Sequence, residues 1–356
     1  MDIPTRGEII REVRERGELI AAVLPFHYPR ALLRAYGFHP MEVWGPPQVD
    51  HRRGVQHFPE YTCDIVQKAT FFLKSPEAAE VDCILIPHTC DSLQGMGSVF
   101  IDFIKPEKPV VTLYHPRGRR ESDLIFIEKE LRSLAKKLGD ISGKSVRSGD
   151  IEREMEIENA VTRLYEDVAL NREEYALSDK DFYRALRSRE YLPPDRFIAL
   201  LESLPKGTPP VTENPIMMSG IVPEPMDIFD SINRFGGHVA IDDFACCSRR
   251  IYREFEERDP FVSLARQMIS MTPDSTVSTP YLERIDFLKK RMESKNARGL
   301  LVYDVKFCEP ELFYIPLIEK AMKEEGWPFL FVEIELATEI PHQVLNRINA
   351  FMEVLS

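Results

Sequence analysis

The chain has 356 residues, of which 44% are hydrophobic and 29% are charged, and its formal net charge is −12 at pH 7. This length is sufficient for two or three domains with substantial cores. The acidic excess disfavours a nucleic-acid partner, since no surplus of basic residues is available to neutralise phosphates.

The sequence also lacks the usual signals for export or membrane insertion. Its first twenty residues are polar and contain no apolar signal core, and no stretch approaches the roughly 18 consecutive apolar residues of a membrane span. We therefore expect a cytoplasmic protein with no membrane contact. In that compartment the six cysteines, at 63, 83, 90, 246, 247 and 308, are unlikely to form a disulfide framework.

The first third of the chain predicts alternating helices and strands. In order, we expect a charged helix over 1–24, a helix from Pro29 to Gly37, a strand over 41–44, a helix from Cys63, a strand over 82–87, a helix over 92–103 and a strand over 110–114. Strands that alternate with helices in this way indicate a parallel sheet.

The alternation of strand and helix patterns stops near residue 117 and resumes near residue 206. The block between them has apolar residues at helical spacing and many charges, which predicts helices with solvated faces. Beyond it we expect strands over 216–220, 238–242, 299–304 and 329–333, a helix that ends at Gly236, and a last helix over 341–355.

The two α/β regions repeat one another. Gly236 follows Gly37 by 199 residues, and Cys308 follows Cys90 by 218 residues, each pair in a similar local context. The fold class is therefore α/β, with two parallel-sheet domains of the Rossmann-like (flavodoxin-like) type and a helical insertion. The expected boundaries are 1–116, 117–205 and 206–356, with a binding site in the cleft between the two α/β domains.

Three cysteines occupy equivalent positions in this pattern. Cys63, Cys90 and Cys308 lie at predicted helix starts, the last two directly behind strands. The positive end of a helix favours thiolate, the form that binds metal. Three such thiolates without a CxxC pair suit an iron–sulfur cluster with one open iron. A zinc site, a nucleophilic pair of Cys90 with His88, and inert buried thiols remain alternatives at this point.

Four segments carry a resemblance to a known family: YTCDIVQKA, LIPHTCDSLQGMGS, FGGHVAIDDFACCSRR and KFCEPELFYIPLIEKAMKEEGWPFLFVEIE. They resemble the 2-hydroxyacyl-CoA dehydratase and benzoyl-CoA reductase superfamily, over about 25–352. The resemblance implies that Cys63, Cys90 and Cys308 hold a [4Fe-4S] cluster at the domain interface, with the fourth iron left to a non-protein ligand.

The same resemblance implies a function. The chain would be one subunit of an anaerobic heterodimer, paired with a paralogous subunit and supplied with electrons by an ATP-hydrolysing iron–sulfur activator. One electron added to an acyl-CoA thioester would give a ketyl radical anion, which eliminates water. The alternatives are a subunit of a benzoyl-CoA (aromatic acyl-CoA) reductase and a non-catalytic partner that relays electrons or serves as a scaffold.

Other residues near the cysteines carry weaker hypotheses. His88, Ser92 and Glu309 are candidates for thioester contact or acid–base chemistry, against the simpler interpretation of helix-start or supporting groups. Arg249 and Arg250 are candidates for CoA phosphates, against a solvated surface.

The remaining cysteines receive structural interpretations. Cys83 is expected in the core. Cys246 and Cys247 are expected in a turn that lines the site, with no assigned role. The superfamily's double-cubane form needs further cysteines, and the turns at 26–28 and 219–220 carry none here; only Cys246 and Cys247 keep that form open.

Overall fold

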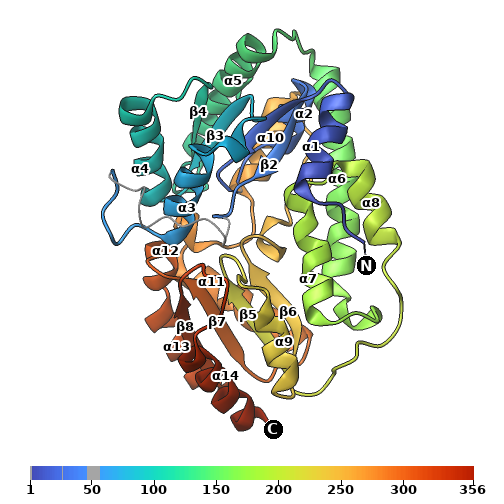
Figure 1. The fold of residues 1–356 in the computed structure, drawn as a ribbon, viewed down its shortest axis with the longest axis vertical. Helices are drawn as coiled ribbons and strands as arrows, with labels where there is room; N and C mark the ends of the chain where they lie inside the picture. The colour runs from blue at the N-terminus through green and yellow to red at the C-terminus, as the bar shows by residue number, and fades with distance from the viewer. Residues whose placement is uncertain (1, 26, 46–56) are drawn as a thin grey trace.

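The computed structural model describes residues 2–25, 27–45 and 57–356, and it contains two four-stranded parallel sheets. The strands of the first are β1 (Leu19–Val23), β2 (Phe38–Glu42), β3 (Cys83–His88) and β4 (Val110–Tyr114). The strands of the second are β5 (Pro215–Gly220), β6 (His238–Phe244), β7 (Leu300–Val305) and β8 (Phe329–Ile334). The orders, β2-β1-β3-β4 and β6-β5-β7-β8, are the same and agree with the flavodoxin-like type. Figure 1 shows one sheet above the other.

Helices surround both sheets. Those of the first region are α1 (Arg6–Glu15), α2 (Arg30–Ala35), α3 (Asp64–Leu73) and α4 (Asp91–Val99), which continues as a π-helical turn over Phe100–Ile104. The middle block contains α5 (Glu121–Ser142), α6 (Ser148–Leu170), α7 (Asp179–Arg187) and α8 (Pro194–Glu202). The second region adds α9 (Asp227–Arg234), α10 (Pro260–Ile269), α11 (Tyr281–Ser294), α12 (Glu309–Leu312), α13 (Ile315–Glu324) and α14 (His342–Leu355).

The predicted helix over 1–24 is wrong in its second half. The helix ends at Glu15, Gly17 turns the chain with a φ of +74°, and β1 follows in the middle of the first sheet, between β2 and β3. The apolar run of β1 is short and buried on both faces, so it shows no alternation that would distinguish a strand from a buried helical segment. The strand expected over 41–44 also lies about three residues earlier, as β2.

The other predicted strands are confirmed, and the middle block is helical as expected. Helix α5 nevertheless packs against the first sheet, since its apolar stripe shares one core with residues of β1, β3 and β4. Helix α10, from the second half of the chain, contributes Leu264 and Met268 to this same core. The boundaries at 116 and 205 therefore stay predictions.

The two sheets are joined through residues at their carboxyl ends. The Asp64 carboxylate, in the first turn of α3, accepts a hydrogen bond from the backbone N–H of Leu336 at 2.6 Å, just beyond β8. Arg250, beyond β6, donates to Glu42 at the end of β2 at 2.5 Å. The carboxyl ends of parallel strands, where ligands bind in open α/β sheets, thus lie toward each other. None of the helices that the structure describes has the length and apolar character needed to cross a membrane.

Candidate functional site

The three predicted cysteines each immediately precede a helix. Cys63 precedes α3, Cys90 precedes α4 and Cys308 precedes α12. Cys90 and Cys308 come directly after β3 and β7, next to the place in each sheet where the strand order reverses. The helix-start prediction is confirmed at all three positions.

The three thiols come together although they derive from different sheets. Burial raises the pKa of Cys63 to about 12, and the nearby Cys90 thiol adds to this rise. Burial likewise raises the pKa of Cys308 well above its usual value, and Asp304, Glu311, Cys63 and Cys90 raise it further. Since charges influence one another in this way only at limited range, the three thiols lie near enough to affect one another.

Other groups at the site favour the thiolate form. Burial raises the pKa of Cys90 to about 11, but backbone N–H groups of Leu93 and Ser92 and the guanidinium of Arg117 act against it. The Ser92 hydroxyl and a backbone N–H of α3 likewise lower the pKa of Cys63 against the effect of burial. These are the donors that a helix start directs at an anion. A cationic group bound there would hold the thiols deprotonated.

Three cysteine thiols are a donor set of the kind that iron–sulfur clusters use. Within the described residues, no three His, Cys, Asp or Glu side chains are close enough to hold one metal ion. A cubane cluster separates its thiolates more widely than a single ion does, and it takes cysteine ligands. All three thiols are free; Cys63 and Cys308 are buried, and Cys90 is partly buried.

The three weaker candidates have different surroundings. Ser92 reaches the Cys63 thiol and so connects two of the cysteines. His88 is buried, and neither ring nitrogen has a hydrogen-bond partner among the described residues; its ring packs edge-on against Tyr114 with 4.4 Å between centroids. Glu309 is exposed at the start of α12. The catalytic roles of all three remain predictions.

Comparison with known proteins identifies the family. The sequence profile described as 2-hydroxyglutaryl-CoA dehydratase, D-component, matches residues 25–355. The chain belongs to this family. The match covers the middle block, the second sheet and three strands of the first sheet, since α1 and β1 precede residue 25.

Three relatives are similar over nearly their full lengths, each at 23% identity. They are lactoyl-CoA dehydratase subunit beta of Anaerotignum propionicum (96% of this chain, 93% of the relative), the (R)-phenyllactyl-CoA dehydratase beta subunit of Clostridium sporogenes (98% and 94%), and (R)-2-hydroxyglutaryl-CoA dehydratase subunit beta of Acidaminococcus fermentans (98% and 95%). All three are named beta subunits, and all three are named dehydratases. The chain is therefore a subunit of the 2-hydroxyacyl-CoA dehydratase family.

The other three cysteines of this family member lie in cores. Cys83 is buried inside β3, as expected. Cys246 and Cys247 are fully buried in the turn after β6, with 3.6 Å between their sulfur atoms. The role of this adjacent pair stays open.

The expectation of a solvated Arg249 and Arg250 is wrong. Arg249 is fully buried and forms ion pairs with Asp243, at 3.1 Å, and with Glu311. Arg250 forms its ion pair with Glu42. Adjacent arginines behind a strand look like a surface turn in a sequence, because their carboxylate partners lie far away along the chain. These buried pairs also leave neither guanidinium exposed to a CoA phosphate.

Asp304 is a functional candidate that the sequence reasoning missed. It is fully buried in β7, and neither carboxylate oxygen has a hydrogen-bond partner in the described part of the chain. Burial and the nearby Glu311 raise the pKa of this carboxyl well above its usual range. An aspartate inside the apolar run of 300–305 was the signal that could have identified it.

Proposed function

We propose that the chain is the β-type subunit of an iron–sulfur 2-hydroxyacyl-CoA dehydratase, and that Cys63, Cys90 and Cys308 hold one [4Fe-4S] cluster. The observation that carries this proposal is that three thiols from two sheets, two of them buried and one partly buried, each precede a helix and lie near one another. Family membership supports it, since the profile spans all three positions.

When bound, such a cluster supplies one-electron transfer at low potential. The chain's own residues prepare the site for it. Backbone N–H groups of α3 and α4, the Ser92 hydroxyl and Arg117 stabilise negative charge on the thiolates. Burial excludes water from the ligands, because Cys63 and Cys308 are only 7% and 8% exposed. Arg249 holds Glu311, in the turn that follows Cys308, in a fixed position.

The partners follow from the relatives by analogy. Beta subunits function with a second kind of subunit, so we propose a heterodimer with a paralogous alpha-type chain, acyl-CoA as substrate and an ATP-hydrolysing iron–sulfur activator as electron source. The reaction would be elimination of water from a 2-hydroxyacyl-CoA. The dehydratase names of all three relatives favour this reaction over reduction of an aromatic acyl-CoA.

One observation favours a second role, that of an electron relay. Four cavities bordered by the described residues have linings that do not include Cys63, Cys90 or Cys308. A cluster at these thiols would then pass electrons to the alpha-type partner, and the acyl-CoA would bind there.

The test is anaerobic purification with measurement of iron and acid-labile sulfide. We expect about four of each per chain, lost on Cys63→Ala, Cys90→Ala or Cys308→Ala. The matched control is Cys83→Ala, which removes a buried thiol outside the site and should keep the iron. No iron under these conditions would contradict the proposal, and about eight irons would implicate Cys246 and Cys247.

A second measurement separates the two roles. Acyl-CoA is titrated into this chain alone and into its complex with the alpha-type chain. A change in the cluster spectrum with this chain alone supports direct substrate binding. A change only in the complex supports the relay.

A further inference from the structure

A cavity with an arginine-rich lining lies at the carboxyl end of the first sheet, and we call it the basic cavity. One part of its lining is the turn 115–120, which joins β4 to α5, and the rest comes from the end of α10 and the start of α11. Its volume, measured as the space open to the centres of water molecules, is about 380 Å³. One water needs roughly 10–15 Å³ on this measure, so the basic cavity accepts a ligand much larger than a single inorganic anion.

The lining carries more positive than negative charge. It includes Arg117, Arg119 and Arg120, and its one carboxylate among the described residues is that of Glu283. Arg120 and Pro280 also lie at the N-termini of α5 and α11, where backbone N–H groups and the helix dipole favour an anion. The charge and the two helix ends together point to an anionic ligand.

Two of these arginines form their ion pairs at the surface. Arg119 pairs with Glu283 at 3.2 Å, and 39% and 51% of the two side chains are exposed. Arg120 pairs with Asp123 at 2.9 Å and is itself mostly exposed. Pairs in which a partner is this exposed contribute only about 0–1 kcal/mol, so a ligand with two or more negative charges can compete for the guanidinium groups.

Arg117 connects the basic cavity to the turn that carries Cys90. Its Nη1 donates to the backbone carbonyl of Thr89 at 2.8 Å and to that of Thr276 at 2.9 Å, which holds the guanidinium in place. Its Nη2 makes no hydrogen bond within the described part of the chain, since the carboxylate of Asp91 is 3.7 Å away. The side chain is partly exposed, so Nη2 is available to an anionic oxygen.

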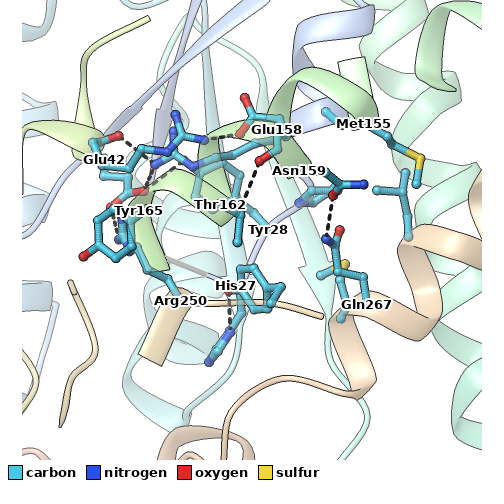
Figure 2. A pocket seen from close by; sticks show the side chains of 17 residues that line it. His27, Tyr28, Glu42, Met155, Glu158, Asn159, Thr162, Tyr165, Arg250 and Gln267 are labelled. Carbon is cyan, nitrogen blue, oxygen red and sulfur yellow. Dashed lines mark hydrogen bonds and ion pairs between the residues drawn. The ribbon is translucent and has the colours of Figure 1, made fainter. Parts of the chain in front are cut away.

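A second arginine-lined cavity, between α6 and α10, shows the opposite situation (Figure 2). Arg250 pairs there with Glu42 and Arg189 pairs with Glu158, and all four side chains are almost fully buried. Breaking a buried pair leaves an uncompensated charge, which costs about 3–5 kcal/mol. Those guanidinium groups are therefore held by the protein, whereas those of the basic cavity can turn toward a ligand.

The rest of the basic cavity suits an organic group. Met268, Ile269, Met271 and Val277 give it apolar surface, and Ser278 adds a hydroxyl group. Methionine sulfur makes favourable contacts with aromatic rings. A purine offers such a ring together with polar edges, and an adenosine phosphate combines it with the negative charge that the arginines favour.

We propose that the basic cavity binds an adenosine phosphate. The phosphate groups lie at Arg117 and Arg119. The purine packs against Met268 and Met271. Coenzyme A and free adenine nucleotides share this chemistry. Binding in the basic cavity does not depend on the proposed cluster, and only coenzyme A as the source of the adenosine phosphate rests on the proposed function.

The test is calorimetric titration of the anaerobically purified chain with coenzyme A and with ADP. We expect saturable binding of at least one of them with a Kd of roughly 100 μM or below. Adenosine, which lacks phosphate, and pyrophosphate, which lacks the purine, should bind at least about tenfold more weakly. Tighter binding of coenzyme A would assign the cavity to the substrate, and tighter binding of ADP would assign it to a free nucleotide. Iron measured on the same samples reports separately on the cluster.

Two variants act on the phosphate contact in opposite directions. Arg119→Gln should weaken binding about tenfold or more, because it removes a charged donor. Glu283→Gln should tighten binding by up to about fivefold, because it releases Arg119 from a competing carboxylate. The matched control is Arg16→Gln. Arg16 forms a similarly exposed pair with Asp195 at 3.1 Å and does not line the basic cavity, so the affinity should be unchanged.

Three results would overturn the proposal. The first is equal binding of ADP and either adenosine or pyrophosphate, which would show that the cavity does not recognise both parts of the ligand. The second is unchanged affinity in Arg119→Gln. The third is the absence of binding by both coenzyme A and ADP.

Discussion

The turns that carry Cys90 and Cys308 occupy the same place in two sheets of identical strand order, yet the charged groups around them differ. At Cys90, the groups that act against burial are backbone N–H donors and Arg117, all of which favour thiolate. At Cys308, the nearest ionisable groups are Asp304 and Glu311, which disfavour it. The shared topology therefore places each thiol, and the residues around it decide how readily it ionises.

The packing of the two turns differs as well. Behind Cys308, a buried network centred on Arg249 links Asp243 in β6 to Glu311 in α12. Behind Cys90, an uncharged contact takes its place: the ring of His88 lies directly against Gly97 of α4. Buried ion pairs stabilise the second turn, at Cys308, and close packing stabilises the first turn, at Cys90. Each variant below tests one of these two contributions.

The largest expected effect is on the buried network. Arg249→Met should lower the free energy of unfolding by about 3–5 kcal/mol, because it leaves Asp243 and Glu311 buried with less compensating charge. Urea denaturation measures this loss.

The control for Arg249→Met is Arg163→Met. Arg163 pairs with Glu254 at 2.6 Å, but its side chain is 61% exposed, so its loss should cost less than about 1 kcal/mol. Equal losses in the two variants would show that the network does not stabilise the second turn.

The next effect is a pH dependence at Asp304. Because burial raises its pKa in the folded state, the folded chain keeps a proton that the unfolded chain releases above about pH 4. Stability is therefore lost as pH rises from there toward the folded pKa. Asp304→Asn removes this loss, so the variant should be more stable than the natural chain at pH 7, by on the order of 2 kcal/mol.

Urea denaturation between pH 4 and pH 8 checks this prediction. The advantage of Asp304→Asn should vanish near pH 4 and grow by up to about 1.4 kcal/mol per pH unit above it. Asp102→Asn, at an exposed position after α4, should change stability by less than about 0.5 kcal/mol at either limit. An advantage that does not vary with pH would argue against a raised pKa at Asp304.

Much of this architecture could be predicted from the sequence, because strand and helix signals alternate clearly and the two halves repeat. The repeat also predicts β1, the strand that the helical pattern over 1–24 hides. Shifting β5 back by the 199 residues that separate the two glycines places a strand over 16–21, close to the observed 19–23. The helical periodicity of α1 obscures this strand, since the predicted helix over 1–24 extends through the turn at Gly17.

The candidate site likewise contains some residues that the sequence predicts and others that it does not. Cys63, Cys90 and Cys308 could be predicted because a helix start is a local signal and the family motifs surround each of them. The ion pairs of Arg249 could not, since its partners lie 6 and 62 residues away along the chain. Only the three-dimensional arrangement distinguishes an arginine that is buried and paired from one that is solvated.

The smallest expected effect concerns the uncharged contact behind Cys90. A Cβ atom at Gly97 would lie 2.4 Å from Nε2 of His88, whereas one at Gly95, in the same helix, would meet no atom within 4 Å. Gly97→Ala should therefore destabilise the chain by about 1–2 kcal/mol through overpacking. Gly95→Ala should instead stabilise it by about 0.5–1 kcal/mol, because alanine favours the helix. His88→Ala combined with Gly97→Ala should cost less than the sum of the two single changes, since removal of the ring frees the space that the new methyl group needs. Additive losses in this double-mutant cycle would show that the ring and the glycine do not depend on each other, and that shape does not hold the first turn.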